Sequence, residues 1–134
     1  MESAKILIVD DDQDLRDSVQ AILQGKRYNA ITAADRDEGM QKIKSEQPDL
    51  LILDVMMTSW KDGFEMAREL KNEPQFKDMP ILMLTGVKED SGINFKTTAG
   101  DPTWCPVDGF LDKPVDPDIL LTEVKRILSK ISKT

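Results

Sequence analysis

The chain has 134 residues, 40% of them hydrophobic, which suits one domain with its own apolar core and leaves too little chain for a second. Its formal net charge of -7 argues against direct binding of nucleic acid and favours metal cations or basic partners. The single cysteine excludes an internal disulfide, and no stretch reaches the roughly 20 apolar residues of a membrane span. Because the first residues also lack the features of a signal peptide, we expect a cytoplasmic protein that does not contact membranes.

Short apolar runs alternate with helix-like segments along the chain. The first run shows little alternation between apolar and polar positions, as expected for a strand that is covered on both faces. In chain order, the five predicted strands are residues 5–9, 28–33, 49–54, 79–85 and 109–113. Strands that alternate with helices in this way predict an α/β domain with a parallel, doubly wound sheet.

Apolar spacing and capping residues predict the first two helices. The first helix has its apolar positions at Leu15, Val19, Ile22 and Leu23. Either Asp12 or Asp14 can cap its start, because both side chains can accept hydrogen bonds from the first turn. The second helix is expected within residues 35–47, where Asp35 and Glu38 have the spacing of a capping box.

The later helices are predicted by the same signals. The third helix has its apolar positions at Phe64, Ala67 and Leu70. A short helix is expected over residues 90–98, before a Gly/Pro-rich loop. The last helix lies within residues 115–131, with Asp116 as its N-cap and Pro117 in its first turn. Its side chains expected to face inward are Ile119, Leu120, Val124, Ile127, Leu128 and Ile131.

Polar residues stand at the carboxyl ends of four of the five predicted strands. Right-handed crossovers between parallel strands bring all carboxyl ends to one edge of the sheet, which is where ligands bind in open α/β folds. The residues at these ends are Asp10, Asp11, Asp54, Thr85 and Lys113. We therefore expect three carboxylates, a hydroxyl and an ammonium group in one small volume.

This set of groups suits a cation and a phosphoryl group. Two carboxylates about 4 Å apart repel by about 4 kcal/mol at an effective dielectric near 20, so three of them need protons or a cation. Oxygen ligands alone favour Mg2+, Mn2+ or Ca2+ over zinc, and Mg2+ readily shares its coordination with phosphate. A carboxylate can attack phosphorus to form an aspartyl phosphate, while a hydroxyl and an ammonium group offset charge on the phosphoryl oxygens.

Five fragments of the sequence resemble one family. In chain order they are ILIVDDD, DLLILDVMM, DGFE, ILMLTG and GFLDKP, and they are similar to the receiver domain of two-component response regulators over nearly the whole chain. The resemblance implies a (βα)5 flavodoxin-like fold, with one five-stranded parallel sheet in the strand order 2-1-3-4-5. It also implies a single receiver domain over residues 1–134, with no output domain in this chain.

The resemblance further implies a metal site next to a phosphoacceptor. Asp54 would be the phosphoacceptor. Asp11, Asp54 and the backbone carbonyl of Met56 would hold Mg2+, or Mn2+ in its place, and Asp10 would act through water.

Residues of the last two strands would respond to the phosphoryl group. By the same resemblance, Thr85 would bind the phosphoryl group and Lys113 would pair with it. Phe110 would be an aromatic switch that turns inward when Thr85 moves. A cis peptide would join Lys113 to Pro114, where cis bonds cost unusually little.

Two stretches depart from the family pattern. From Met56 the chain reads MMTSWKDG, one residue longer than usual, and the segment 86–109 is also long. Met56 and Val87 occupy two positions that commonly tune hydrolysis, and neither side chain can orient a water. We therefore expect the aspartyl phosphate of the isolated protein to persist well beyond a few seconds, which its dephosphorylation rate would measure.

The absence of histidine bears on the phosphoryl donor. Without histidine the chain cannot be its own phosphohistidine donor, so a separate histidine kinase or histidine phosphotransfer protein is implied. The output would be a protein target near Phe110 and the last helix, bound by a monomer or a phosphorylation-dependent dimer. Apart from Mg-dependent self-phosphorylation and autodephosphorylation, we expect no enzymatic turnover.

Two alternatives stay open from the residues alone. A phosphatase of the haloacid dehalogenase type would use Asp10 as its nucleophile, but this hypothesis gives Asp54 no role and requires a different residue at Asp14. A receiver-like adaptor that is never phosphorylated would keep the same fold with altered loops. A nucleotide-binding domain is disfavoured, because no glycine-rich loop follows the first strand.

Overall fold

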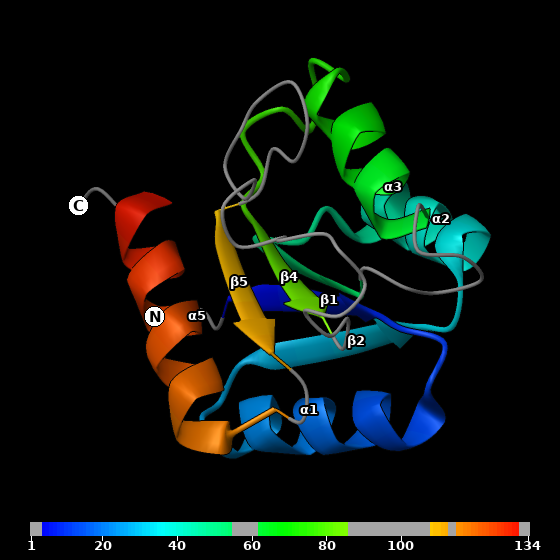
Figure 1. The fold of residues 1–134 in the computed structure, drawn as a ribbon. Coiled ribbons are helices and arrows are strands. Elements are labelled where there is room, and N and C mark those ends of the chain that lie inside the picture. Colours follow the sequence, from blue (N-terminus) through cyan, green and yellow to red (C-terminus); the bar gives the residue numbers. More distant parts are fainter. Residues whose placement is uncertain (1–3, 55–61, 86–107, 113–114, 132–134) are drawn as a thin grey trace, which may run out of the picture.

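Five parallel strands form one sheet in the computed structural model, which describes residues 4–54, 62–85, 108–112 and 115–131. The strands are β1 (Lys5–Val9), β2 (Asn29–Ala33), β3 (Leu50–Asp54), β4 (Ile81–Thr85) and β5 (Gly109–Asp112). They lie in the order β2-β1-β3-β4-β5, and each neighbouring pair is parallel (Figure 1). This confirms the predicted five-stranded, doubly wound sheet and its flavodoxin-like order.

Helices cover both faces of this sheet. One face carries α1 (Gln13–Gly25) and α5 (Pro117–Ile131), and the other carries α2 (Arg36–Glu46) and α3 (Asp62–Lys71), as Figure 1 shows. The short helix predicted over residues 90–98 lies outside the described residues. In the described part of the chain, no helix is both long enough and apolar enough to cross a bilayer.

Alternate residues of the central strands enter two separate cores. Leu7 and Val9 of β1 pack in the core beneath α2 and α3, whereas Ile6 and Ile8 pack in the core beneath α1 and α5. All four side chains are fully buried. Because both faces of the strand are covered, its sequence is apolar at every one of these positions.

Three of the predicted strands began too early. The structure starts β2 and β3 one residue later and β4 two residues later than predicted. Before β2 and β4, turns take up N–H groups of the preceding residues. The Tyr28 N–H donates to the Leu23 carbonyl at 3.1 Å, and the Met79 N–H donates to the Phe76 carbonyl at 3.0 Å. A backbone N–H that closes a turn is not available to a sheet ladder.

Aspartates cap the helices that begin after β1 and β5. Asp12 caps α1, since its Oδ1 accepts the N–H of Asp14 at 3.0 Å and that of Leu15 at 3.3 Å. Of the two predicted candidates, Asp12 is therefore the cap. Asp116 accepts the N–H groups of the second and third residues after it, which confirms its predicted role in α5.

The prediction that Ile119 faces inward is wrong. Ile119 is 55% exposed, whereas Leu120, Val124 and Ile127 of the same helix are buried. Each residue turns a helix by about 100°, so a stripe centred near Leu120 and Val124 extends toward only one of its flanks. That flank carries Leu121 and Leu128, which pack against the core, and Ile119 lies on the opposite flank.

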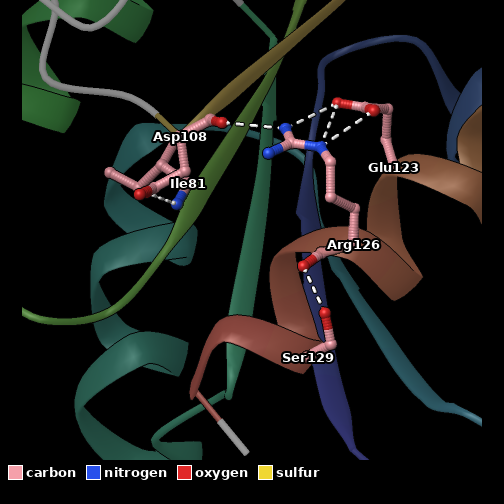
Figure 2. Close-up of polar contacts among 5 residues, drawn as sticks. All are labelled: Ile81, Asp108, Glu123, Arg126 and Ser129. Atoms are coloured by element: carbon pink, nitrogen blue, oxygen red, sulfur yellow. Dashed lines mark hydrogen bonds and ion pairs between the residues drawn. The ribbon is translucent and has the colours of Figure 1, made fainter.

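An aspartate joins the amino-terminal ends of β4 and β5 (Figure 2). The Asp108 N–H donates to the Ile81 carbonyl and the Ile81 N–H donates to Asp108 Oδ2, both at 2.8 Å. Arg126 of α5 donates to the Asp108 carbonyl at 3.1 Å and pairs with Glu123 at 2.7 Å. Lys71 Nζ lies 3.7 Å from Asp108 Oδ2. These contacts hold β5 against β4, α3 and α5.

Asp108→Ala is expected to lower the free energy of unfolding by about 1 to 2 kcal/mol, because the part-buried Ile81 N–H loses its acceptor. Asp108→Asn is the matched control. It keeps an oxygen that can accept this bond and removes only the charge opposite Lys71, so it should cost less than about 0.5 kcal/mol. Urea unfolding of both variants measures the difference. Equal losses would contradict the importance of the hydrogen bond.

Candidate functional site

Three carboxylates lie together at the carboxyl ends of β1 and β3. These strands are neighbours, with Val9 opposite Leu53, so the residues that follow the two strand positions are adjacent. One carboxylate oxygen from each of Asp10, Asp11 and Asp54 lies within 4.8 Å of the other two. Asp10 and Asp54 are buried, whereas Asp11 is exposed. The cluster therefore has a buried base and a side that faces solvent.

The chemistry of this cluster fits a hard divalent cation. At separations near 5 Å, each pair of charges repels by about 3 kcal/mol at an effective dielectric near 20, and a cation removes that cost. Carboxylate oxygens are the ligands that Mg2+ and Mn2+ prefer, and Mg2+ accepts a site with few protein ligands because it keeps several waters. Asp10, Asp11 and Asp54 are the described residues that could hold such an ion.

A network of hydrogen bonds holds the backbone of Asp10. Its N–H donates to the Ala33 carbonyl of β2 at 3.2 Å, and its Oδ1 accepts the Asp12 N–H at 2.9 Å. Arg16 of α1 donates from Nη1 to the Asp10 carbonyl at 2.7 Å. Arg16 was not among the predicted site residues. Its position one turn into the helix that follows three acids was the available signal.

The end of β4 adjoins the carboxylate cluster. Asp54 pairs in register with Leu84 of β4. Thr85 is the next residue of β4, one position beyond the partner of Asp54. Thr85 in turn pairs with Asp112, the last residue of β5. The other predicted site residues, Met56, Lys113 and Pro114, lie outside the described residues, as does the side chain of Thr85.

Phe110, the predicted switch, lies in the middle of β5 opposite Met83. Its side chain is partly buried and packs against the core beneath α2 and α3. This position is compatible with a ring that contributes to the core, and the predicted motion stays a prediction.

Glu38 links the start of α2 to the end of β2. Asp35 is the N-cap of α2 and accepts the Glu38 N–H at 2.8 Å, as predicted. Glu38 Oε1 accepts the N–H of Ala34 at 2.8 Å, one residue before the position that a capping box uses. This hydrogen bond, together with the contacts to Lys42, lowers the pKa of Glu38 below its ordinary value of 4.5.

The lowered pKa of Glu38 predicts how stability depends on pH. A carboxylate with a lower pKa in the folded state contributes stability above its unfolded-state pKa, and this contribution is lost as pH falls through the folded-state pKa. Glu38→Gln is therefore expected to be less stable than wild type near neutral pH, with a difference that shrinks between about pH 5 and 3. Urea unfolding across this pH range tests the expectation. A difference that does not change with pH would contradict it.

The fold and the acidic cluster define a class of signalling domains. Residues 6–125 match the family model of the response regulator receiver domain, and the chain belongs to this family. Receiver domains bind Mg2+ at an acidic cluster of the kind formed by Asp10, Asp11 and Asp54. The predicted resemblance is thereby confirmed.

Several characterised relatives share this domain. The alkaline phosphatase synthesis transcriptional regulatory protein PhoP of Bacillus subtilis is 34% identical over 94% of the chain, which covers 49% of PhoP. The phosphate regulon transcriptional regulatory protein PhoB of Escherichia coli is 29% identical over 96% of the chain, which covers 53% of PhoB. The chain therefore spans about half the length of these curated relatives.

Solved structures of the same length also resemble the chain. A putative response regulator from Chloroflexus aurantiacus is 32% identical, with a TM-score of 0.83, over 96% of this chain and 99% of that one. The chemotaxis protein CheY4 of Vibrio cholerae is 34% identical, with a TM-score of 0.80, over 93% of this chain and 98% of that one.

Proposed function

We propose that this receiver domain is a phosphorelay switch in which Asp54 accepts a phosphoryl group from a histidine kinase or a histidine phosphotransfer protein. The observation that carries the proposal is the carboxylate cluster of Asp10, Asp11 and Asp54, whose oxygens lie within 4.8 Å of one another. Asp54 is the buried member at the end of β3, the position that the family resemblance gives to the phosphoacceptor. By the same resemblance, Asp10 has a supporting role through water.

The transfer itself needs little covalent chemistry from the protein. A carboxylate oxygen of Asp54 attacks phosphorus, the P–N bond of the phosphohistidine breaks, and the ring nitrogen keeps the bonding electrons. Asp11, Asp54 and the Met56 carbonyl would hold Mg2+, with Asp10 acting through water, and the ion would supply positive charge near the phosphoryl oxygens. Thr85 donates a hydrogen bond to one of these oxygens and Lys113 pairs with another.

The output follows from the new charge on Asp54. A phosphoryl group carries about two negative charges near neutral pH, which can shift an equilibrium between two states of the domain. In the proposed switch, Thr85 moves toward the phosphoryl group and Phe110 turns inward. A cis peptide bond joins Lys113 to Pro114. The partner surface then lies on β5 and α5, and a downstream protein or a second copy of the chain binds there.

Intact-mass measurement of the wild-type protein tests this function. With a small phosphodonor and Mg2+, the mass should increase by one phosphoryl group, and with EDTA in place of Mg2+ it should not. The isolated phosphoprotein should lose this mass slowly, since Met56 and Val87 cannot orient a water. Equal phosphorylation in EDTA would contradict the role of the carboxylate cluster.

The two alternative functions give different results in the same experiment. A phosphoryl group on Asp10 would indicate the phosphatase chemistry, which the family match does not support. No mass gain with any donor would indicate an adaptor that is not phosphorylated.

A further inference from the structure

Hydrogen bonds connect Asp10, Asp12 and Arg16 in a ring that holds the segment between β1 and α1. Asp10 Oδ1 accepts the Asp12 N–H at 2.9 Å, and Asp12 caps α1. The Arg16 N–H donates to the Asp12 carbonyl at 3.0 Å, and Arg16 Nη1 returns to the Asp10 carbonyl at 2.7 Å. Arg16 thus contacts the segment through both its backbone and its side chain.

Arg16 contacts the peptide group that orients Asp11. A peptide bond is planar, so the Asp10 carbonyl and the Asp11 N–H lie in one rigid unit. Asp11 belongs to neither a strand nor a helix, and it is the exposed member of the carboxylate cluster. A donor on the Asp10 carbonyl therefore limits the rotation of the plane from which the Asp11 side chain leaves.

We propose that Arg16 is a positioning residue for the cation site, which it serves by holding the Asp10–Asp11 peptide so that the Asp11 carboxylate faces Asp10 and Asp54. The inference rests on the proposed function, because it assumes that the cluster binds Mg2+. Groups that orient metal ligands in this way typically change metal affinity by about 10- to 100-fold when they are removed.

A positive charge this close to the cluster also has an opposing effect. The Arg16 guanidinium repels a cation, so its removal would strengthen Mg2+ binding if charge alone mattered. Its side chain is only partly buried, which lets water screen this repulsion. It also lies near Glu38, whose pKa it helps to lower after the larger effects of Ala34 and Lys42, so part of its charge is already offset. Positioning is therefore expected to outweigh repulsion.

The Mg2+ affinity of variants, measured by calorimetry without a phosphodonor, separates the two effects. Arg16→Met removes the donor at similar length and should weaken Mg2+ binding by about tenfold. Arg16→Lys keeps the charge and should recover part of the affinity. Gln20→Met is the matched control, because Gln20 Nε2 also donates from α1 to a backbone carbonyl, that of Ala30 at 3.0 Å, outside the carboxylate cluster. Its affinity should equal that of wild type.

Each outcome bears on the inference. Mg2+ binding by Arg16→Met that equals or exceeds wild-type binding would overturn it, and so would an equal loss in Gln20→Met. If Arg16→Met shows no cooperative unfolding in EDTA, Arg16→Leu, which also lacks a donor, replaces it under the same criteria. A wild-type protein that binds no Mg2+ would overturn both this inference and the proposed function. Wild-type binding with an unaffected Arg16→Met would overturn the inference alone.

Discussion

Asp54→Asn is expected to abolish phosphorylation by a small donor while the protein stays folded. An amide oxygen is a poor nucleophile toward phosphorus and carries no charge for a cation, so both the acceptor and one ligand are lost. Intact-mass measurement with Mg2+ and donor should show no gain. Asp78→Asn is the control, because Asp78 is exposed before β4, away from the carboxyl ends of the strands, and this variant should gain mass as wild type does. A mass gain that persists in Asp54→Asn would contradict the assignment.

Although Asp54→Asn abolishes phosphorylation, it should make the metal-free protein more stable. Without metal, Asp54→Asn relieves part of the repulsion among carboxylates within 4.8 Å of one another, so it should raise the free energy of unfolding in EDTA by about 1 kcal/mol. Mg2+ at about 100 times its dissociation constant should stabilise wild type by about 2.7 kcal/mol and the variant by much less. Thermal unfolding with Mg2+ and with EDTA measures both effects. A variant that Mg2+ stabilises as much as wild type would show that Asp54 is not a ligand.

Gly39→Ala is expected to destabilise the protein by about 1 to 2 kcal/mol, although alanine is the better helix former. A Cβ at this buried position of α2 would lie 3.0 Å from both Val9 Cγ2 and Met66 Cε. The Met66 methyl group can move, but the branched Val9 side chain in the central strand cannot easily do so. Overpacking of this kind costs about 1 to 3 kcal/mol, which exceeds the gain of about 1 kcal/mol in helix propensity.

Gly25→Ala is expected to raise the free energy of unfolding, in contrast to Gly39→Ala. A Cβ at Gly25, the last residue of α1, would meet no atom within 4 Å. Without a clash, only the propensity effect remains, and the variant should be more stable than wild type by about 0.5 kcal/mol. Urea unfolding of both variants gives the comparison. Two variants that shift in the same direction would show that space around Gly39 does not decide its effect.

The capping and strand predictions that succeeded rest on local information. An apolar run such as Ile6–Val9 is typical of a strand covered on both faces, and Asp12, Asp35 and Asp116 cap helices within three residues of themselves. The carboxylate cluster was also predictable. Once the strands are parallel, chain topology brings the carboxyl ends of β1 and β3, with Asp10, Asp11 and Asp54, to the same edge.

Other features were decided by packing between segments far apart in the chain. The exposure of Ile119 depends on how α5 rotates against the sheet, and the Asp108–Ile81 pair joins residues 27 positions apart. The Arg16 contact with Asp10 depends on the angle at which α1 leaves β1. Periodicity and helix caps are local, so the elements, their order and the acids at the strand ends can be predicted from the residues alone. The side chains that hold those acids in place depend on helix rotation and long-range hydrogen bonds, which follow from packing of the whole domain.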